Sequence, residues 1–155
     1  MSKLKPGGKV PNFSLPMNGG GTWSLKDAAG KKLVIYFYPR DMTSGCTREA
    51  QDFRDLEKAF RKAATQIVAV SRDSVASHDR FAAKESLPFP LLADVDEKLC
   101  KLFDVIQEKS LYGRKYLGVE RSTFLLDGSA RLKQEWRKVK VPGHAEAVLE
   151  AAQRL

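Results

Sequence analysis

The chain has 155 residues, of which 43% are hydrophobic, and its formal net charge is +8 at neutral pH. That length suits one domain with its own core, so we expect a single domain over residues 1–155. No apolar run approaches the length of a membrane span, and the N-terminus lacks the hydrophobic segment of a secretory signal. We therefore expect no membrane association and a cytoplasmic location.

The strongly basic balance, with a pI near 9.6, can accompany nucleic-acid binding. Here the basic residues are dispersed in short groups, and acidic residues interrupt them along the chain. No basic block with interleaved aromatic residues is present, which single-strand binding would need. We expect a solvated basic surface and no nucleic-acid partner.

The first part of the chain predicts two short strands, a buried strand and a long helix. The short strands lie near residues 13–15 and 22–23, around a glycine turn, and a capped turn follows at 24–29. Residues 33–38 form an almost continuous apolar run, which is typical of a strand buried on both faces. Beyond it, apolar residues recur at helical spacing from near Cys46 to about Ala63.

The rest of the chain alternates between strands and helices. Residues 66–71 predict a second buried strand, and Asp73 or Ser74 is expected to cap a helix that runs to Lys84. The remaining predicted elements are a strand at 91–92, a helix at 97–103, a hairpin of 122–126 with 131–136, and a helix from 142 to 155. This order predicts an α/β fold with a mixed central sheet flanked by helices.

Cys46 lies where the buried strand gives way to the long helix, in the expected first helical turn. Amides of that turn have no intrahelical acceptors, and the positive end of the helix dipole lies there, so both stabilise a negative charge. A cysteine in this position forms the nucleophilic thiolate more readily than a free cysteine. We therefore expect Cys46 to be a solvent-facing catalytic nucleophile, with a buried structural cysteine as the alternative.

The spacing Pro39-x-x-x-Thr43-x-x-Cys46 resembles the active-site signature of the peroxiredoxins, which are thiol peroxidases. Other segments, in order along nearly the whole chain, are similar to the peroxiredoxin Q group, also called bacterioferritin comigratory protein. These segments are Tyr36-Phe37-Tyr38-Pro39, Cys46-Thr47-Arg48-Glu49-Ala50, Val70-Ser71-Arg72-Asp73, Phe89-Pro90-Leu91-Leu92-Ala93-Asp94 and Glu120-Arg121-Ser122-Thr123-Phe124. The resemblance implies a thioredoxin-like fold with an N-terminal β extension.

The resemblance also implies an activity, the reduction of hydrogen peroxide and alkyl hydroperoxides without a cofactor. Cys46 would attack the peroxide and become a sulfenic acid. Thr43 is expected to place a hydroxyl beside the sulfur, and Pro39, which lacks an N–H, to shield the thiolate from water. The residue pattern alone favours a surface arginine at position 121. The resemblance implies instead that Arg121 pairs with the thiolate and that Glu49 helps to orient it.

The sulfenic acid must be reduced by a thiol, and the usual positions of a resolving cysteine are empty. In the peroxiredoxin Q group this cysteine lies five residues after the first or in the helix after the second buried strand. Here Gln51 and the cysteine-free segment 77–84 occupy those places. Cys100, the only other cysteine, has apolar neighbours, so we expect it to be structural.

The preferred hypothesis is a one-cysteine mechanism with an external reductant, either thioredoxin or glutaredoxin with glutathione. The alternative is a two-cysteine cycle in which Cys100 resolves the sulfenic acid. A general thiol–disulfide oxidoreductase is disfavoured because Thr43 stands in place of the first cysteine of a Cys-x-x-Cys motif. The non-enzymatic alternative is a basic thioredoxin-like binding module.

The sequence bears less directly on metals, substrate contacts and assembly. His78 and His144 lie far apart with no ligand spacing around either, so we expect surface histidines and no metal. Phe37, Phe53 and the segment 111–112 form either an apolar entrance for the substrate or part of the core. The resemblance implies a monomer, with a weak dimer as the alternative.

Overall fold

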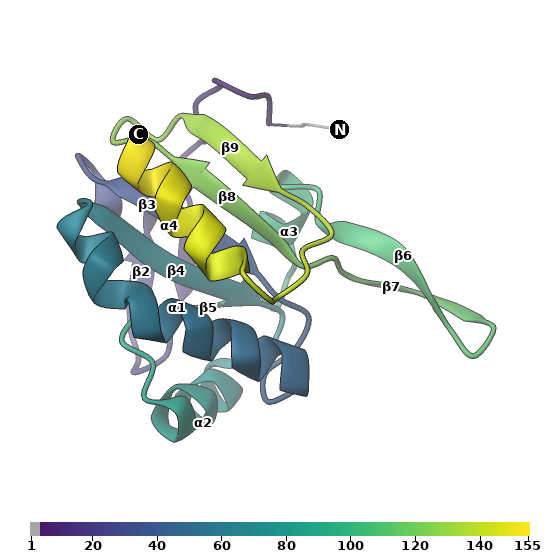
Figure 1. Ribbon diagram of the computed structural model, residues 1–155. Coiled ribbons are helices and arrows are strands. Elements are labelled where there is room, and N and C mark those ends of the chain that lie inside the picture. The colour runs from purple at the N-terminus through teal and green to yellow at the C-terminus, as the bar shows by residue number, and fades with distance from the viewer. Residues whose placement is uncertain (1–3) are drawn as a thin grey trace.

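The computed structural model describes residues 4–155 and contains the mixed sheet that the sequence predicts (Figure 1). Strand β3 (Lys32–Phe37) lies at its centre, parallel to β4 (Thr65–Ser71) and antiparallel to β8 (Ser122–Leu126). Strands β5 (Leu91–Ala93) and β9 (Leu132–Trp136) complete the order β5-β4-β3-β8-β9. Near the N-terminus, β1 (Ser14–Pro16) and β2 (Thr22–Ser24) form a separate two-stranded sheet.

Side chains of β3 alternate between two hydrophobic clusters, one on each face of the sheet. Val34 and Tyr36 belong to the cluster shared with α1 (Ser44–Lys62) and α4 (His144–Arg154). Ile35 belongs to the other cluster, with α3 (Lys98–Leu102) and the N-terminal segment. The short helix η1 (Leu25–Ala28) and α2 (Val75–Glu85) each contribute to one of these clusters. Helices therefore cover both faces, as predicted.

Helix α1 follows the carboxyl end of β3 and packs its apolar face against the sheet. Thr43 takes extended backbone angles and acts as the N-cap. The predicted apolar face is buried through Ala50, Phe53 and Phe60, and it packs toward α4. The helix ends at Lys62, and Ala64 adopts a left-handed conformation with φ of 54° before β4 begins. This connection fixes the start of α1 at the carboxyl end of the central strand.

A hairpin of β6 (Ile106–Leu111) and β7 (Arg114–Val119) was not predicted, and it extends away from the body of the molecule (Figure 1). Its strands pair only with each other among the described residues, and apart from Ile106 and Val119 at the base, most of their length has no buried apolar face. Leu111 and Tyr112 lie at its tip, and Tyr112 is 96% exposed, so this segment is not core. Phe37 and Phe53, in contrast, are fully buried in the two clusters.

Side-chain caps set the starts of the shorter helices. Ser74, one of the two predicted caps, accepts from the Ser77 amide at the start of α2. The carboxylate of Asp94 accepts from the amides of Leu99 and Cys100 and thereby holds α3. Over residues 4–155 the structure contains no helix with the length and apolarity to cross a membrane.

Candidate active site

Cys46 lies in the first turn of α1, just beyond the carboxyl end of β3, where the sequence places it. Its side chain packs against the cluster on the α1 face, and the residue is only 1% exposed. The expectation of a solvent-facing thiol was therefore wrong. The apolar run that buries β3 on both faces also buries the residue at the start of the following helix. Any reagent must reach the sulfur through the loop and the side chains around it.

Arg121 provides a positive charge beside this sulfur. Its Nη2 atom donates to Cys46 Sγ at 3.5 Å, and its Nη1 atom donates to Glu49 Oε1 at 2.6 Å. The residue lies directly before β8, and its carbonyl oxygen accepts from the Val139 amide. The guanidinium thus has a fixed backbone origin and two acidic neighbours, the Glu49 carboxyl group and the Cys46 thiol. The structure brings Cys46, Arg121 and Glu49 together across the sheet and the helix.

Gly45 permits this approach, a role that sequence reasoning missed. A methyl group at position 45 would lie 3.1 Å from Arg121 Nη2, which is closer than most side-chain contacts allow. Glycine costs about 1 kcal/mol in a helix relative to alanine. A glycine in the first turn of a long helix was the signal in the sequence that something approaches the backbone closely.

Glu49 is buried below Arg121, with a residual exposure of 1%. Burial raises the pKa of Glu49 to about 7, although the adjacent guanidinium opposes this. For Arg121 itself burial favours a lower pKa, but Glu49 and Cys46 outweigh burial and raise it. Arg121 consequently stays protonated, while Glu49 gains or loses a proton near neutral pH.

Two buried polar side-chain atoms have no hydrogen-bond partner among residues 4–155. They are Glu49 Oε2 and Tyr36 Oη. Tyr36 is stacked on Phe53, with ring centroids 4.6 Å apart. Burial, followed by the charges of Glu49 and Cys46, raises the pKa of Tyr36 well above its usual value. Tyr36 is therefore a neutral phenol on the same side of the sheet as the sulfur.

Thr43 and Pro39 lie in the loop between β3 and α1, three and seven residues before Cys46. The Thr43 hydroxyl donates to the Arg40 carbonyl oxygen at 3.0 Å, which orients its lone pairs but does not occupy them. The hydroxyl can therefore still accept a hydrogen bond from a bound O–H group. Thr43 is exposed, whereas Pro39 is half-buried.

Both histidines are buried, and the expectation of surface histidines was wrong. His144 is 7% exposed at the start of α4, and its Nε2 atom lies 2.7 Å from the Thr123 hydroxyl. Burial, assisted by the charge of Arg121, lowers the pKa of His144 to about 4. His78 is fully buried in α2. Each histidine is buried because a polar partner distant in the sequence satisfies it.

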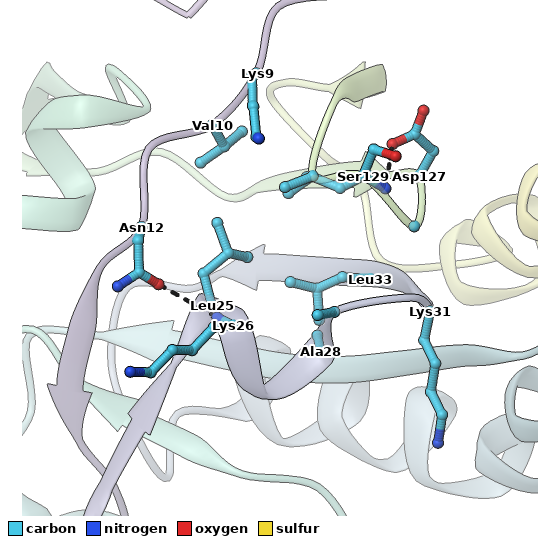
Figure 2. Close-up of a pocket in the computed structure, with 14 residues that line it drawn as sticks. Lys9, Val10, Asn12, Leu25, Lys26, Ala28, Lys31, Leu33, Asp127 and Ser129 are labelled. Carbon is cyan, nitrogen blue, oxygen red and sulfur yellow. Dashed lines mark hydrogen bonds between the residues drawn. The ribbon is translucent and has the colours of Figure 1, made fainter.

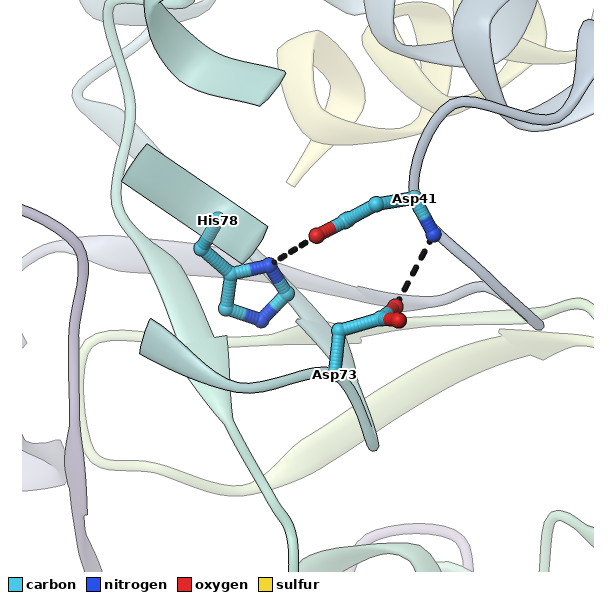
Figure 3. Close-up of side chains that lie close together, drawn as sticks. All are labelled: Asp41, Asp73 and His78. Carbon is cyan, nitrogen blue, oxygen red and sulfur yellow. Dashed lines mark hydrogen bonds and ion pairs between the residues drawn. The ribbon is translucent and has the colours of Figure 1, made fainter. Parts of the chain in front are cut away.

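The only metal-ligand cluster found among residues 4–155 consists of Asp41, Asp73 and His78 (Figure 3). One potential ligand atom from each lies within 4.8 Å of the others. No spacing in the sequence indicates this grouping. These atoms already form hydrogen bonds, since Asp41 Oδ2 contacts His78 Nδ1 and Asp73 Oδ2 accepts from the Asp41 amide. The residues are occupied with one another rather than arranged around a vacant centre.

Cys100 lies on the opposite face of the sheet from Cys46. It belongs to the cluster around Ile35 and is fully buried, whereas Cys46 belongs to the cluster around Tyr36. Burial, and the negative charge of Asp94, raise the pKa of the Cys100 thiol far above its usual value. The expected structural role thus has a physical basis in the packing of α3.

A hollow of about 540 Å³ lies at the other end of β3 (Figure 2). Val10, Leu25 and Leu33 form part of its apolar wall, and Lys31 lies at its edge and points away. None of the predicted site residues lines it. Leu33 lies near the amino end of the strand, whereas Cys46 follows the carboxyl end. The nucleophile, the fixed cation and the helix start therefore mark the candidate active site, and this hollow does not.

Comparison with known proteins identifies the relatives of this chain. Residues 6–135 match the model of the AhpC/TSA family. Peroxiredoxin Bcp of Xanthomonas campestris is 56% identical over 141 residues, covering 90% of this chain and 88% of its own length. Peroxiredoxin Bcp of Bacillus subtilis is 49% identical over 147 residues, covering 95% and 94% of the two chains.

Solved structures agree with this assignment. Xanthomonas campestris Peroxiredoxin Q superposes with a TM-score of 0.88 at 54% identity, covering 92% of this chain and 90% of the other. A variant of Xylella fastidiosa PrxQ reaches a TM-score of 0.94 at 42% identity, covering 99% and 98%. Another structure of the Xanthomonas protein, also named bacterioferritin comigratory protein, was determined to study its alkyl peroxide reduction activity.

Proposed function

The chain belongs to the AhpC/TSA family and to its peroxiredoxin Q, or Bcp, group, with a thioredoxin-like fold, and we propose that it reduces peroxides through the thiolate of Cys46. The proposed substrates are hydrogen peroxide and alkyl hydroperoxides. The observation that carries the proposal is the contact of 3.5 Å between Arg121 Nη2 and Cys46 Sγ at the start of a helix. A fixed guanidinium and first-turn amides stabilise the charge of the attacking sulfur and that of the departing oxygen.

The chemical step transfers two electrons from sulfur to the peroxide. The Cys46 thiolate attacks the hydroxyl oxygen of ROOH, so an S–O bond forms while the O–O bond breaks. The sulfur becomes a sulfenic acid, and the departing RO⁻ takes up a proton and leaves as water or an alcohol. Attack requires the O–O bond to be held in line with the sulfur.

Thr43 and Pro39 serve this geometry in the proposed mechanism. Because the Thr43 hydroxyl donates its proton to the Arg40 carbonyl, its lone pairs remain free to accept the O–H of the incoming peroxide. Pro39 in the same loop is proposed to shield the sulfur, and it offers no N–H donor that would compete. Glu49 holds the guanidinium in place through the contact at 2.6 Å.

For regeneration we propose a one-cysteine cycle with an external thiol. One thiol of the reductant condenses with the sulfenic acid and releases water, and a second thiol then displaces the Cys46 thiolate and leaves as a disulfide. Thioredoxin, or glutaredoxin with glutathione, could act in this way in the reducing cytoplasm. Support comes from the position of Cys100, which is buried in the cluster on the other face of the sheet.

The intact mass of the reduced protein, after one equivalent of hydrogen peroxide without added thiol, tests both parts of the proposal. A gain of one oxygen that maps to Cys46, and that is absent from Cys46→Ser, is the expected result. A loss of two hydrogens, absent from Cys100→Ser, would mean an intramolecular disulfide and would overturn the one-cysteine cycle. An unchanged mass at Cys46 would overturn the peroxidase itself.

A further inference from the structure

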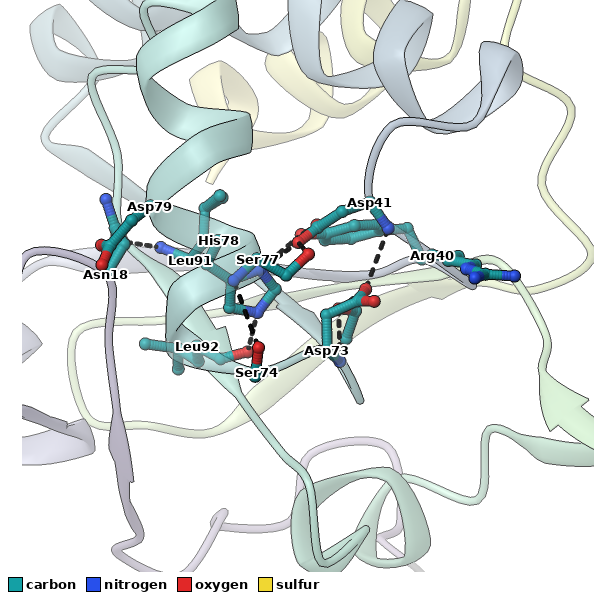
Figure 4. A network of polar contacts seen from close by, with 12 residues as sticks. Asn18, Arg40, Asp41, Asp73, Ser74, Ser77, His78, Asp79, Leu91 and Leu92 are labelled. Carbon is teal, nitrogen blue, oxygen red and sulfur yellow. Dashed lines mark hydrogen bonds and ion pairs between the residues drawn. The ribbon is translucent and has the colours of Figure 1, made fainter.

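We propose that His78 and Asp41 form a buried ion pair that positions the active-site loop of residues 39–43, and that this pair accelerates the reaction of Cys46 with peroxide. The inference rests on the proposed function. Asp41 lies within that loop, two residues after Pro39 and two before Thr43. His78 lies in the first turn of α2, so the pair joins two separate parts of the chain (Figure 4).

The carboxylate of Asp41 is buried and fully used. Tyr38 donates its hydroxyl to Oδ1 at 2.6 Å, while the Ser77 hydroxyl and His78 Nδ1 both contact Oδ2 at 2.8 Å. Ser77 and His78 belong to α2, and Tyr38 directly follows β3. A carboxylate with three donors in a buried site holds its backbone firmly, because each lost contact would leave a buried charge unsatisfied.

Both ring nitrogens of His78 face oxygen atoms that accept hydrogen bonds. Nε2 lies 3.0 Å from the Leu92 carbonyl oxygen, which cannot donate, so Nε2 carries a proton. Nδ1 lies 2.8 Å from the Asp41 carboxylate, which needs a second proton on the ring if it is ionised. Hydrogen bonds from His78 and Tyr38 outweigh burial and lower the pKa of Asp41, which favours the carboxylate. The geometry thus assigns an imidazolium to His78.

The main chain of Asp41 is anchored as well. Its amide donates to Asp73 Oδ2 at 2.9 Å, and the Ser71 hydroxyl donates to the same oxygen at 2.6 Å. Figures 3 and 4 show His78 beside the carboxylate of Asp41 and Asp73 beside its amide. Asp41 is therefore held from two elements, the end of β4 and the start of α2.

Holding Asp41 in place also restrains the backbone of its two neighbours, Arg40 and Met42. Met42 adopts a left-handed conformation with φ of 66°, which is uncommon for a residue with a side chain and needs support from its surroundings. On the other side, the Arg40 carbonyl receives the Thr43 hydroxyl. Movement of Asp41 would shift that carbonyl, and with it the hydroxyl that faces the peroxide. His78 is accordingly a positioning residue that acts through Asp41, not a catalytic one.

Two variants of the His78–Asp41 pair (the loop-pair variants) and a matched control test whether the pair positions the active-site loop. His78→Gln removes the charge of the ring, and Asp41→Asn removes that of the carboxylate. Asp79→Asn weakens a different contact of the same helix, the bond from the Gly19 amide to Asp79 Oδ1. We expect the rate constant for oxidation of Cys46 by peroxide, measured by rapid quenching and mass spectrometry, to fall about tenfold in either loop-pair variant. It should stay at the wild-type value in the control.

The double variant separates positioning through one pair from two independent effects. We expect it to be no slower than the slower single variant, because both substitutions break the same interaction. Multiplied losses, an unchanged rate in both single variants, or an equal loss in Asp79→Asn would each overturn the proposal. The rate at which an external thiol reduces the sulfenic acid should be unchanged, because that step does not need the peroxide to be oriented.

A spectroscopic measurement on the unaltered protein covers the case in which a variant fails to fold. Nitrogen-15 spectra at neutral pH should show both ring nitrogens of His78 in the protonated form. One unprotonated nitrogen would overturn the ion pair. This result does not depend on peroxidase activity, so a wild-type protein that failed to oxidise Cys46 would contradict the proposed function, while the spectrum would still decide the state of His78.

Discussion

Glu49 and His144 are buried on the same face of the sheet, and their pKa values are displaced in opposite directions. The pKa of Glu49 rises from 4.5 to about 7, so its contribution to stability is complete below pH 4.5 and is lost as the pH rises to about 7. The pKa of His144 falls from 6.5 to about 4, so its contribution is complete above pH 6.5 and is lost as the pH falls to about 4. Each displacement corresponds to about 3 kcal/mol.

The two contributions oppose each other over nearly the same pH range, so they should almost cancel in the wild type. Removing one group should then reveal the other. In His144→Gln the free energy of unfolding should decrease by about 2 to 3 kcal/mol between about pH 4 and pH 6.5, because the Glu49 term is then unopposed and this range lies below that in which the His78 ion pair contributes to the pH dependence. In Glu49→Gln it should increase by about the same amount over that range, because only the His144 term remains.

Urea unfolding at a series of pH values measures these slopes. All proteins should carry Cys46→Ser, so that titration of the catalytic thiol does not contribute. Gln at either position keeps hydrogen-bonding capacity while removing the titration, which limits the change to charge. Three parallel curves of stability against pH, for the parent and both variants, would refute the reasoning. A steep slope in the parent alone would do so as well.

Three further variants probe the site. Arg121→Gln should lower the rate constant for oxidation of Cys46 by about 100-fold or more, as loss of one charge-stabilising donor does elsewhere; a loss below about tenfold in stopped-flow assays would argue against its role. Gly45→Ala should slow the same reaction by about tenfold by displacing the guanidinium, even though alanine favours the helix by about 1 kcal/mol; an unchanged rate would contradict the close approach seen at 3.1 Å. Cys100→Ser should leave steady-state turnover with an external thiol within about twofold of wild type while lowering the melting temperature, because a hydroxyl is buried in an apolar cluster. Loss of turnover in a folded Cys100→Ser protein would indicate that this thiol takes part.

Periodicity in the sequence sufficed for the elements with a buried face. Strand β3, helix α1 and the hairpin of β8 and β9 lie close to their predicted positions because their apolar residues repeat at strand or helix spacing. Most of the β6–β7 hairpin has no such repeat, since only its base, at Ile106 and Val119, packs against the cluster on the main sheet. A strand pair that is solvated on both sides leaves little trace in hydrophobic pattern.

The site was predicted only in part, for a related reason. The placement of Cys46 at a helix start follows from local sequence, but the contact of Arg121 with Glu49 joins residues 72 positions apart. No local pattern encodes such a pair, and the resemblance to peroxiredoxins supplied it. The burial of His78 depends in the same way on Asp41, which lies 37 positions earlier. The burial of a histidine can be predicted from local sequence only when its hydrogen-bond partner is nearby in the sequence.

Because the sheet separates the sulfurs of Cys46 and Cys100, the reactivity of Cys100 can report on local unfolding of the face opposite the active site. A thiol reagent can follow the route of the peroxide to Cys46, whereas Cys100 becomes accessible only when α3 and the N-terminal segment part from the sheet. The rate of Cys100 alkylation in the native protein therefore measures the free energy of that opening. If oxidation of Cys46 destabilises the fold, Cys100 on the opposite face of the sheet should be alkylated faster.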